Sequence, residues 1–131
     1  LLAAKDGSCV AAIHAGWRGL AAGIFKDTVG SLPVPPSNLV ACIGPAISSS
    51  HYNVRRDVYS TFAHPSAPNI RERRNNQYFL NLSAIVKTFA RQCSISCFER
   101  TNACSYTCNN IIYSARRDER TGRLSAFALR T

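Results

Sequence analysis

A single histidine stands at the turn between two predicted elements of this 131-residue chain. His14 follows the apolar run 10–13, and Gly16 and Gly19 bound the turn that comes next. A strand that ends on a histidine holds the imidazole in one place, where its neutral form can serve as a metal ligand or general base. A hydrogen-bonded core histidine is the alternative. Catalytic zinc takes three protein ligands, and the sequence offers no second or third ligand close to His14.

The next candidate, Arg18, falls in the first turn of the helix that is predicted to follow. Free N–H groups and the helix dipole favour anions at that place, and a guanidinium can donate two parallel hydrogen bonds to phosphate or carboxylate. The alternative is a surface arginine stacked on Trp17. For Trp17 itself the sequence favours a core position over a ligand platform.

A second group of cations lies near the end of the chain, where Arg116 and Arg117 precede Asp118. Thr121, Gly122 and Arg123 complete a tight turn with positive charge on both sides. Such a turn could clamp an anion. In the other interpretation Asp118 pairs with one of the arginines and only fixes the turn.

The chain has six cysteines, at positions 9, 42, 93, 97, 104 and 108. Cys9 and Cys42 sit in apolar runs, which favours small buried thiols in an intracellular protein over disulfides. Cys93 and Cys97, like Cys104 and Cys108, are separated by three residues, whereas most zinc knuckles use two. This spacing disfavours a structural zinc site at the four cysteines. Cys104 could line a pocket, but a nucleophilic cysteine needs a base and the sequence names none. His51 and His64 fall in polar loops and are expected to be solvated.

The length fits one domain, and the formal net charge of +9 attracts phosphorylated ligands or nucleic acid. The basic residues come in short groups without interleaved exposed aromatics, which disfavours nucleic-acid binding. No apolar run approaches the ~20 residues of a membrane span, and no secretory signal is present, so we expect a cytoplasmic protein without membrane association. The chain opens in strand-like residues without Met, and residues 1–131 are therefore expected to be the C-terminal part of a longer protein, or a gene remnant.

Apolar spacing predicts the elements that must position these residues. Together they indicate a single α+β domain of layered mixed β-sheets with flanking helices. Strands are expected over 8–13, 39–43, 78–80, 95–99 and 123–129, helices over 20–32, 54–63 and 82–93, a strand or short helix over 111–114, and exposed loops over 64–76 and 101–110.

Several motifs in this order resemble one family, the YfiH/YlmD-like proteins, also called multicopper polyphenol oxidases or laccase-like proteins and, more recently, purine nucleoside phosphorylases. The resemblance covers nearly the whole chain. The motifs are His14-Ala15-Gly16-Trp17-Arg18-Gly19, Ile43-Gly44-Pro45-Ala46-Ile47, Tyr52-Asn53-Val54, Phe79-Leu80-Asn81-Leu82, Cys104-Ser105-Tyr106, Ser114-Ala115-Arg116-Arg117-Asp118 and Thr121-Gly122-Arg123-Leu124.

The resemblance implies phosphorolysis of adenosine, inosine or methylthioadenosine, with adenosine deamination as a further activity. It also implies a zinc site, with copper as the alternative metal, held by two histidines and one cysteine. His14 matches one of these ligands, and the other two would precede residue 1. Ala115 replaces the family's usual tyrosine. Because the two turns that carry them favour anions, we further expect Arg18 and either Arg116 or Arg117 to hold the phosphate.

Three other functions stay open at this point. A copper-dependent polyphenol oxidase is one, although the chain has only three histidines for a multicopper cluster. A peptidoglycan editing factor is the second. The third is an inactive remnant or interaction module.

Overall fold

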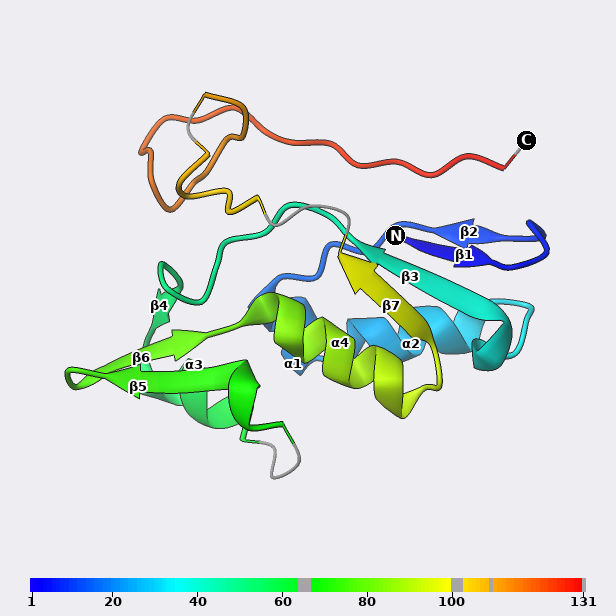
Figure 1. Cartoon of the computed structure of the whole chain (residues 1–131), viewed down its shortest axis with the longest axis horizontal. Helices are drawn as coiled ribbons and strands as arrows, with labels where there is room; N and C mark the ends of the chain where they lie inside the picture. The colour runs from blue at the N-terminus through cyan, green and yellow to red at the C-terminus, as the bar shows by residue number, and fades with distance from the viewer. Residues whose placement is uncertain (64–66, 100–102, 109, 131) are drawn as a thin grey trace.

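The computed structural model describes residues 1–63, 67–99, 103–108 and 110–130, and it confirms the α+β class with mixed sheets and flanking helices. One sheet has four strands in the order β2-β1-β3-β7, and the other has three in the order β4-β6-β5 (Figure 1). The strands are β1 (Leu2–Ala4), β2 (Val10–Ala11), β3 (Leu39–Ile43), β4 (Asn53–Val54), β5 (Arg71–Arg74), β6 (Gln77–Leu80) and β7 (Ser96–Glu99). The helices are α1 (Trp17–Ala21), α2 (Ile24–Ser31), α3 (Arg56–Thr61) and α4 (Leu82–Gln92), with 3₁₀ turns η1 (Pro36–Asn38) and η2 (Pro68–Ile70).

The four-stranded sheet is antiparallel over β2, β1 and β3, and parallel between β3 and β7. Gly7 has φ +75° in the turn that joins β1 to β2. Only Val10–Ala11 of the predicted strand 8–13 pairs with a neighbour. His14 therefore lies in the extended segment between β2 and α1, beyond the last paired residue of the strand.

The predicted helix over 20–32 is two helices, α1 and α2. Gly23 separates them with φ +93°, a left-handed conformation that glycine adopts without the steric cost of a side chain. Leu20 is buried from α1, and Phe25 and Val29 are buried from α2.

Helix α4 confirms the helix that apolar spacing predicts over 82–93. Asn81 caps its first turn by accepting a hydrogen bond of 3.0 Å from the Ala84 N–H. Ile85 and Ala90 are buried, and the Phe89 ring lies 6.3 Å from that of Phe25 on α2. The helix packs on β3 and β7 and carries the hydrophobic core across to α2.

The three-stranded sheet corrects the predicted exposed loop over 64–76. Residues 71–74 form strand β5, which pairs with β6 through a turn at Asn75 and Asn76. Both asparagines have positive φ, 46° and 62°, as a type I′ hairpin turn requires. The sequence did not predict this strand because its residues are charged. Charged residues are compatible with a strand here because β5 lies at the edge of the sheet, where its side chains are exposed or partly exposed. The predicted helix over 54–63 is shorter, because Val54 pairs with β6 before α3 begins.

The final predicted strand, 123–129, is wrong for the described residues. This segment runs extended along the outside of the molecule and pairs with no described strand (Figure 1). Leu124, Phe127 and Leu129 are 53%, 75% and 77% exposed. The alternation of apolar residues is real, but no described strand lies beside it to receive its backbone hydrogen bonds. Residues 111–114 likewise form neither a strand nor a helix, although Ile112 and Ser114 are buried.

Among the described residues, no helix has the length and apolar character needed to cross a bilayer.

Candidate functional site

His14 presents its imidazole at the surface, which excludes the core alternative. The ring lies over Gly16, the residue that precedes α1. A Cβ at Gly16 would come within 3.1 Å of His14 Nε2. The missing side chain of Gly16 therefore makes room for the imidazole in this position.

A metal at His14 needs ligands that the described residues do not provide. No group of three His, Cys, Asp or Glu side chains lies close enough together in the described part of the chain to hold an ion. A catalytic zinc takes three protein ligands. The residues present thus do not by themselves fit the zinc or copper ion that the resemblance implies. His64 and the side chain of Cys97 lie outside the described residues.

Arg18 lies in the first turn of α1, as predicted, and its guanidinium carbon is 4.7 Å from the centre of the Trp17 ring. The proposed stacking on Trp17 is therefore present. Trp17 is partly buried and packs against the hydrophobic core. The guanidinium remains exposed, so its donors are available to a ligand.

Arg116 approaches the same region from the far end of the chain. Its guanidinium carbon lies 4.8 Å from the centre of the Tyr52 ring, and Nη1 donates 2.8 Å to the carbonyl of Asn53. Burial raises the pKa of the Tyr52 phenol, while the positive charges of Arg116 and Arg18 oppose that rise. Arg116 therefore contacts a buried tyrosine, and the charge of Arg18 acts on the same phenol, although the two arginines come from opposite halves of the sequence.

Arg117 has a different environment from its neighbour. Its Nε and Nη2 donate to both carboxylate oxygens of Asp118, at 2.8 to 3.1 Å. Nη1 donates to the carbonyls of Ser105 and Tyr106, each at 3.1 Å, and Nη2 also donates to Ile112. The side chain is only 18% exposed. Every nitrogen of the guanidinium thus donates a hydrogen bond that holds this loop. Arg117 is therefore the arginine that pairs with Asp118 and fixes the turn.

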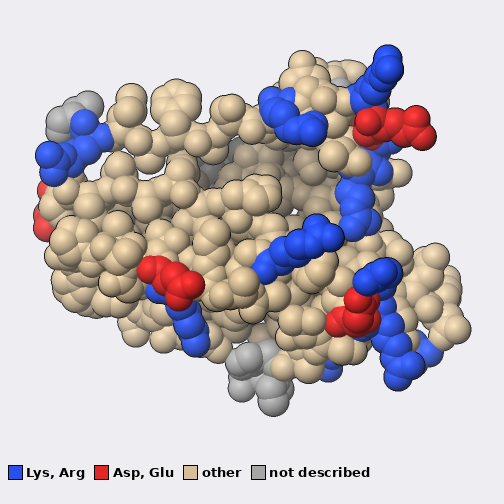
Figure 2. Space-filling view, turned by 180° about the vertical axis from the view of Figure 1, so that it is seen from behind, with Lys and Arg blue, Asp and Glu red and all other residues tan. Residues whose placement is uncertain are grey.

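The remaining basic residues do not gather in one block. On the face shown in Figure 2, Lys and Arg side chains lie in separate groups, several of them beside an acidic residue. Arg55 pairs with Asp57 at 2.7 Å and Arg74 with Glu72 at 3.0 Å. Within the described part of the chain the positive charge near Tyr52 has no ion-pair partner, and it is therefore a local feature of the site.

The structure also joins Cys104 to a histidine that sequence reasoning placed in solvent. Residue 104 forms a parallel bridge with Ala46, which brings its Sγ to 3.1 Å from Ser48 Oγ and 3.9 Å from His51 Nδ1. The His51 ring stacks on Tyr106, with centres 4.6 Å apart. We call these four residues, Ser48, His51, Cys104 and Tyr106, the thiol cluster. No sequence signal links them, because the contact spans two loops that are far apart in the chain.

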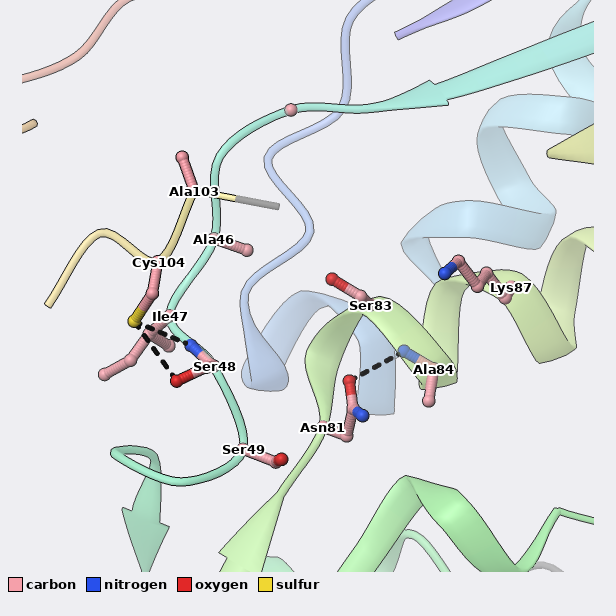
Figure 3. Close-up of a pocket in the computed structure, with 11 residues that line it drawn as sticks. Ala46, Ile47, Ser48, Ser49, Asn81, Ser83, Ala84, Lys87, Ala103 and Cys104 are labelled. Carbon is pink, nitrogen blue, oxygen red and sulfur yellow. Dashed lines mark hydrogen bonds between the residues drawn. The ribbon is translucent and has the colours of Figure 1, made fainter. Parts of the chain in front are cut away.

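A cavity of about 230 Å³ adjoins the thiol cluster. Cys104 and Ser48 lie at one end, and the first turns of α4, with Asn81, Ser83 and Lys87, line the other (Figure 3).

Comparison with known proteins places this geometry in context. Residues 1–131 match the family described as multi-copper polyphenol oxidoreductase laccase. A protein of Escherichia coli strain K12 named purine nucleoside phosphorylase YfiH is 33% identical over 127 residues, which covers 94% of this chain and 51% of that protein. A Xylella fastidiosa protein named purine nucleoside phosphorylase is 32% identical over 133 residues, covering 98% of this chain and 51% of the relative.

Solved structures agree with these relatives. A crystal structure of a Neisseria meningitidis protein superposes with a TM-score of 0.83 and 31% identity, over 89% of this chain and 50% of that one. The hypothetical protein YfiH of Bacillus licheniformis gives a TM-score of 0.80 and 25% identity, over 90% of this chain and 48% of that one. The chain spans about half the length of the curated relatives it matches. The prediction that this half is the C-terminal portion is not borne out.

Proposed function

Because this chain belongs to the multi-copper polyphenol oxidoreductase laccase family and has relatives named purine nucleoside phosphorylase, we propose that it takes part in the phosphorolysis of purine nucleosides. Adenosine, inosine and methylthioadenosine are the proposed substrates, with inorganic phosphate as the second. The observation that supports this function is the contact of Arg116 with Tyr52, on whose phenol the positive charge of Arg18 also acts.

The two guanidiniums form an anion site by the following argument. Among the described residues, no carboxylate lies within ion-pair distance of Arg18 or Arg116. Two cations that both act on one phenol repel each other, and an anion between them would remove that repulsion. A guanidinium matches the geometry of phosphate oxygens with two parallel N–H donors. Arg116 is therefore proposed over Arg117 as the second phosphate ligand, since the donors of Arg117 are already used.

Phosphorolysis needs one phosphate oxygen to attack the anomeric carbon of the ribose, while the bond from that carbon to the purine nitrogen breaks and the base leaves with a proton. Arg18 and Arg116 would hold the phosphate in position for this attack, which reduces the entropy cost of bringing two substrates together. His14 is proposed as the one ligand that this chain offers to zinc or copper. No step of the reaction is assigned to that metal, because the described residues do not complete its site.

The experiment is phosphate-dependent release of hypoxanthine from inosine, measured on the longest natural polypeptide that contains this sequence. Loss of one charge-assisted contact of about 1.5–3 kcal/mol should raise the KM for phosphate by roughly 10- to 150-fold in Arg18→Ala and in Arg116→Ala. Arg120→Ala, an exposed arginine of the same turn, is the matched control and should leave that KM unchanged.

His14→Ala completes the test. We expect it to abolish release while the protein remains folded. Release that needs neither phosphate nor His14, or no release from a folded and zinc-loaded protein, would contradict the proposal. Oxygen-dependent oxidation of a phenol by the same protein, in place of phosphorolysis, would favour the activity named in the family's description.

A further inference from the structure

The thiol cluster holds a sulfur atom in surroundings that stabilise its negative charge. The Ser48 N–H donates to Cys104 Sγ at 3.3 Å, and Ser48 Oγ lies 3.1 Å from the same atom. Partial burial opposes ionisation, but these hydrogen bonds, with those from the backbone of Thr107 and Tyr106, lower the pKa of Cys104 to about 6. Hydrogen bonds to the charged form favour that form. Cys104 is therefore largely a thiolate at neutral pH.

A connected set of proton carriers runs from the sulfur towards solvent. His51 Nδ1 lies 3.0 Å from Ser48 Oγ and 3.0 Å from Ser50 Oγ, and the two hydroxyl oxygens are 2.8 Å apart. Ser50 is exposed, whereas His51 is held between its serine partners and the ring of Tyr106. A proton can thus reach the neighbourhood of Cys104 from water through groups within hydrogen-bond distance of one another.

A second thiol lies one turn along the chain. The Cys108 N–H donates 3.0 Å to the Cys104 carbonyl, so residues 104–108 form a single helical turn. One such turn separates the two Cα atoms by about 6 Å and their Cβ atoms by about 5–6 Å, so a disulfide of about 4 Å between Cβ atoms forms once the turn opens slightly. Cys108 is partly exposed and is not part of a disulfide.

These observations separate two classes of reagent that could use the site. A carbon electrophile needs only a thiolate. A hydroperoxide also needs hydrogen-bond donors beside the sulfur and a proton for the departing oxygen, and the thiol cluster contains both. A low-pKa, accessible cysteine with a second thiol nearby is the usual arrangement of a site that is oxidised reversibly.

We propose that Cys104 is a redox modification site that reacts with hydroperoxides, with His51 and Ser48 as its positioning residues and Cys108 as the resolving thiol. The thiolate attacks one peroxide oxygen, the O–O bond breaks, and the departing oxygen leaves as hydroxide or alkoxide, which takes a proton through Ser48 and His51. The sulfur is oxidised by two electrons to sulfenic acid, and the peroxide is reduced to water or alcohol. Cys108 Sγ then attacks the sulfenic sulfur, which forms a disulfide and releases water.

The test treats the whole chain, with cysteines reduced beforehand, with hydrogen peroxide at pH 6 and measures oxidation of each cysteine by mass spectrometry. At this pH a thiol with a pKa near 6 is about half ionised, whereas an ordinary thiol is well under one per cent ionised. Because nucleophilicity falls with pKa, the net advantage expected for Cys104 in the folded protein over Cys104 in urea-unfolded protein is about tenfold. Equal rates in the folded and the unfolded protein would overturn the proposal.

Variants test the role of the neighbours. Ser48→Ala and His51→Gln should slow oxidation of Cys104, while Ser83→Ala, which changes a cavity hydroxyl that lies across from the sulfur, should not. A rate in Ser48→Ala equal to that of the unaltered protein would show that the cluster does not activate the thiol. Circular dichroism melts confirm that each variant is folded.

The second step has its own readout. The unaltered protein should lose two hydrogens as Cys104 and Cys108 join, and Cys108→Ser should instead accumulate a sulfenic acid that dimedone traps. Equal dimedone labelling in both proteins would overturn the role of Cys108. None of these measurements depends on nucleoside phosphorolysis.

Discussion

A methyl group on Gly16 would come within 3.1 Å of Nε2 of His14, closer than the imidazole can accept without moving. The φ of Gly16 is −74°, so the backbone itself would tolerate a side chain there. The constraint at this position is therefore the histidine ring. It explains why the two residues occur together at the turn between β2 and α1.

Gly16→Ala tests this relationship. We expect the imidazole to shift, while the free energy of unfolding falls by about 1 kcal/mol or less, the cost of alanine at a helix N-cap. The shift is measured from the His14 ring resonances by NMR, with hypoxanthine release as the functional readout. Gly30→Ala is the control, because open space surrounds that position. Unchanged His14 resonances would contradict the expectation.

Arg116 and Arg117 should separate into a ligand-binding and a structural residue. Arg117→Ala leaves Asp118 and three backbone carbonyls without their donor, and we expect it to lower the free energy of unfolding by about 2–3 kcal/mol. Arg116→Ala removes an exposed side chain and should change the free energy of unfolding by about 0.5 kcal/mol or less. Urea denaturation measures both. The reverse order of stabilities would show that the roles are exchanged.

Gly23 should be intolerant of substitution for a backbone reason. Its φ of +93° costs an ordinary L residue about 1–2 kcal/mol, so Gly23→Ala is expected to destabilise the protein by that amount. Gly30→Ala, inside α2, should instead stabilise by about 0.5–1 kcal/mol, because alanine is the better helix former. Thermal denaturation of the two variants checks the contrast, and a neutral Gly23→Ala would remove the argument for a strained break between α1 and α2.

Alkylation of Cys104 by iodoacetamide should follow an unusual pH profile. Because its pKa is lowered to about 6, the rate should rise through pH 6 and level off near pH 7, while unfolded protein continues to gain reactivity towards about pH 8.5. His51 Nδ1 lies 3.9 Å from the sulfur, the Tyr106 ring stacks on His51, and Lys87 lines the adjoining cavity from α4. A profile for Cys104 that matches the unfolded protein would contradict the hydrogen-bonded thiolate.

The same shift has a consequence for stability. A thiol whose pKa is lowered by folding stabilises the native state fully above its unfolded pKa, and this contribution disappears as pH falls through about 6. Cys104→Ser should therefore reduce the difference in free energy of unfolding between pH 8 and pH 5. Urea denaturation at the two pH values measures it, and an unchanged difference would argue against ionisation of this thiol in the folded protein.

Elements whose structure depends on residues close together in the chain could be predicted from the sequence. The apolar stripe of α4 and its Asn81 cap are both readable in sequence, because side chains three and four apart must share a helix face. The run that forms β3 is similarly clear, since its residues are apolar and bounded by turn residues. His14 and Arg18 were identified from their turn, whose glycines and neighbours lie within six residues.

Strand pairing and side-chain contacts between segments far apart in the chain could be seen only in the tertiary structure. Alternation over 123–129 does not make a strand without a described neighbour, whereas the charged run of β5 does, because β6 pairs with it. Arg116 and Arg117 are indistinguishable in sequence, and only the fold directs one to Tyr52 and the other to Asp118. His51 reaches Cys104 only because the chain brings Ala46 beside residue 104. Residue type and spacing thus determined which side chains could bind a metal, bind an anion or react. Pairing between distant backbone segments determined which of these side chains lie together.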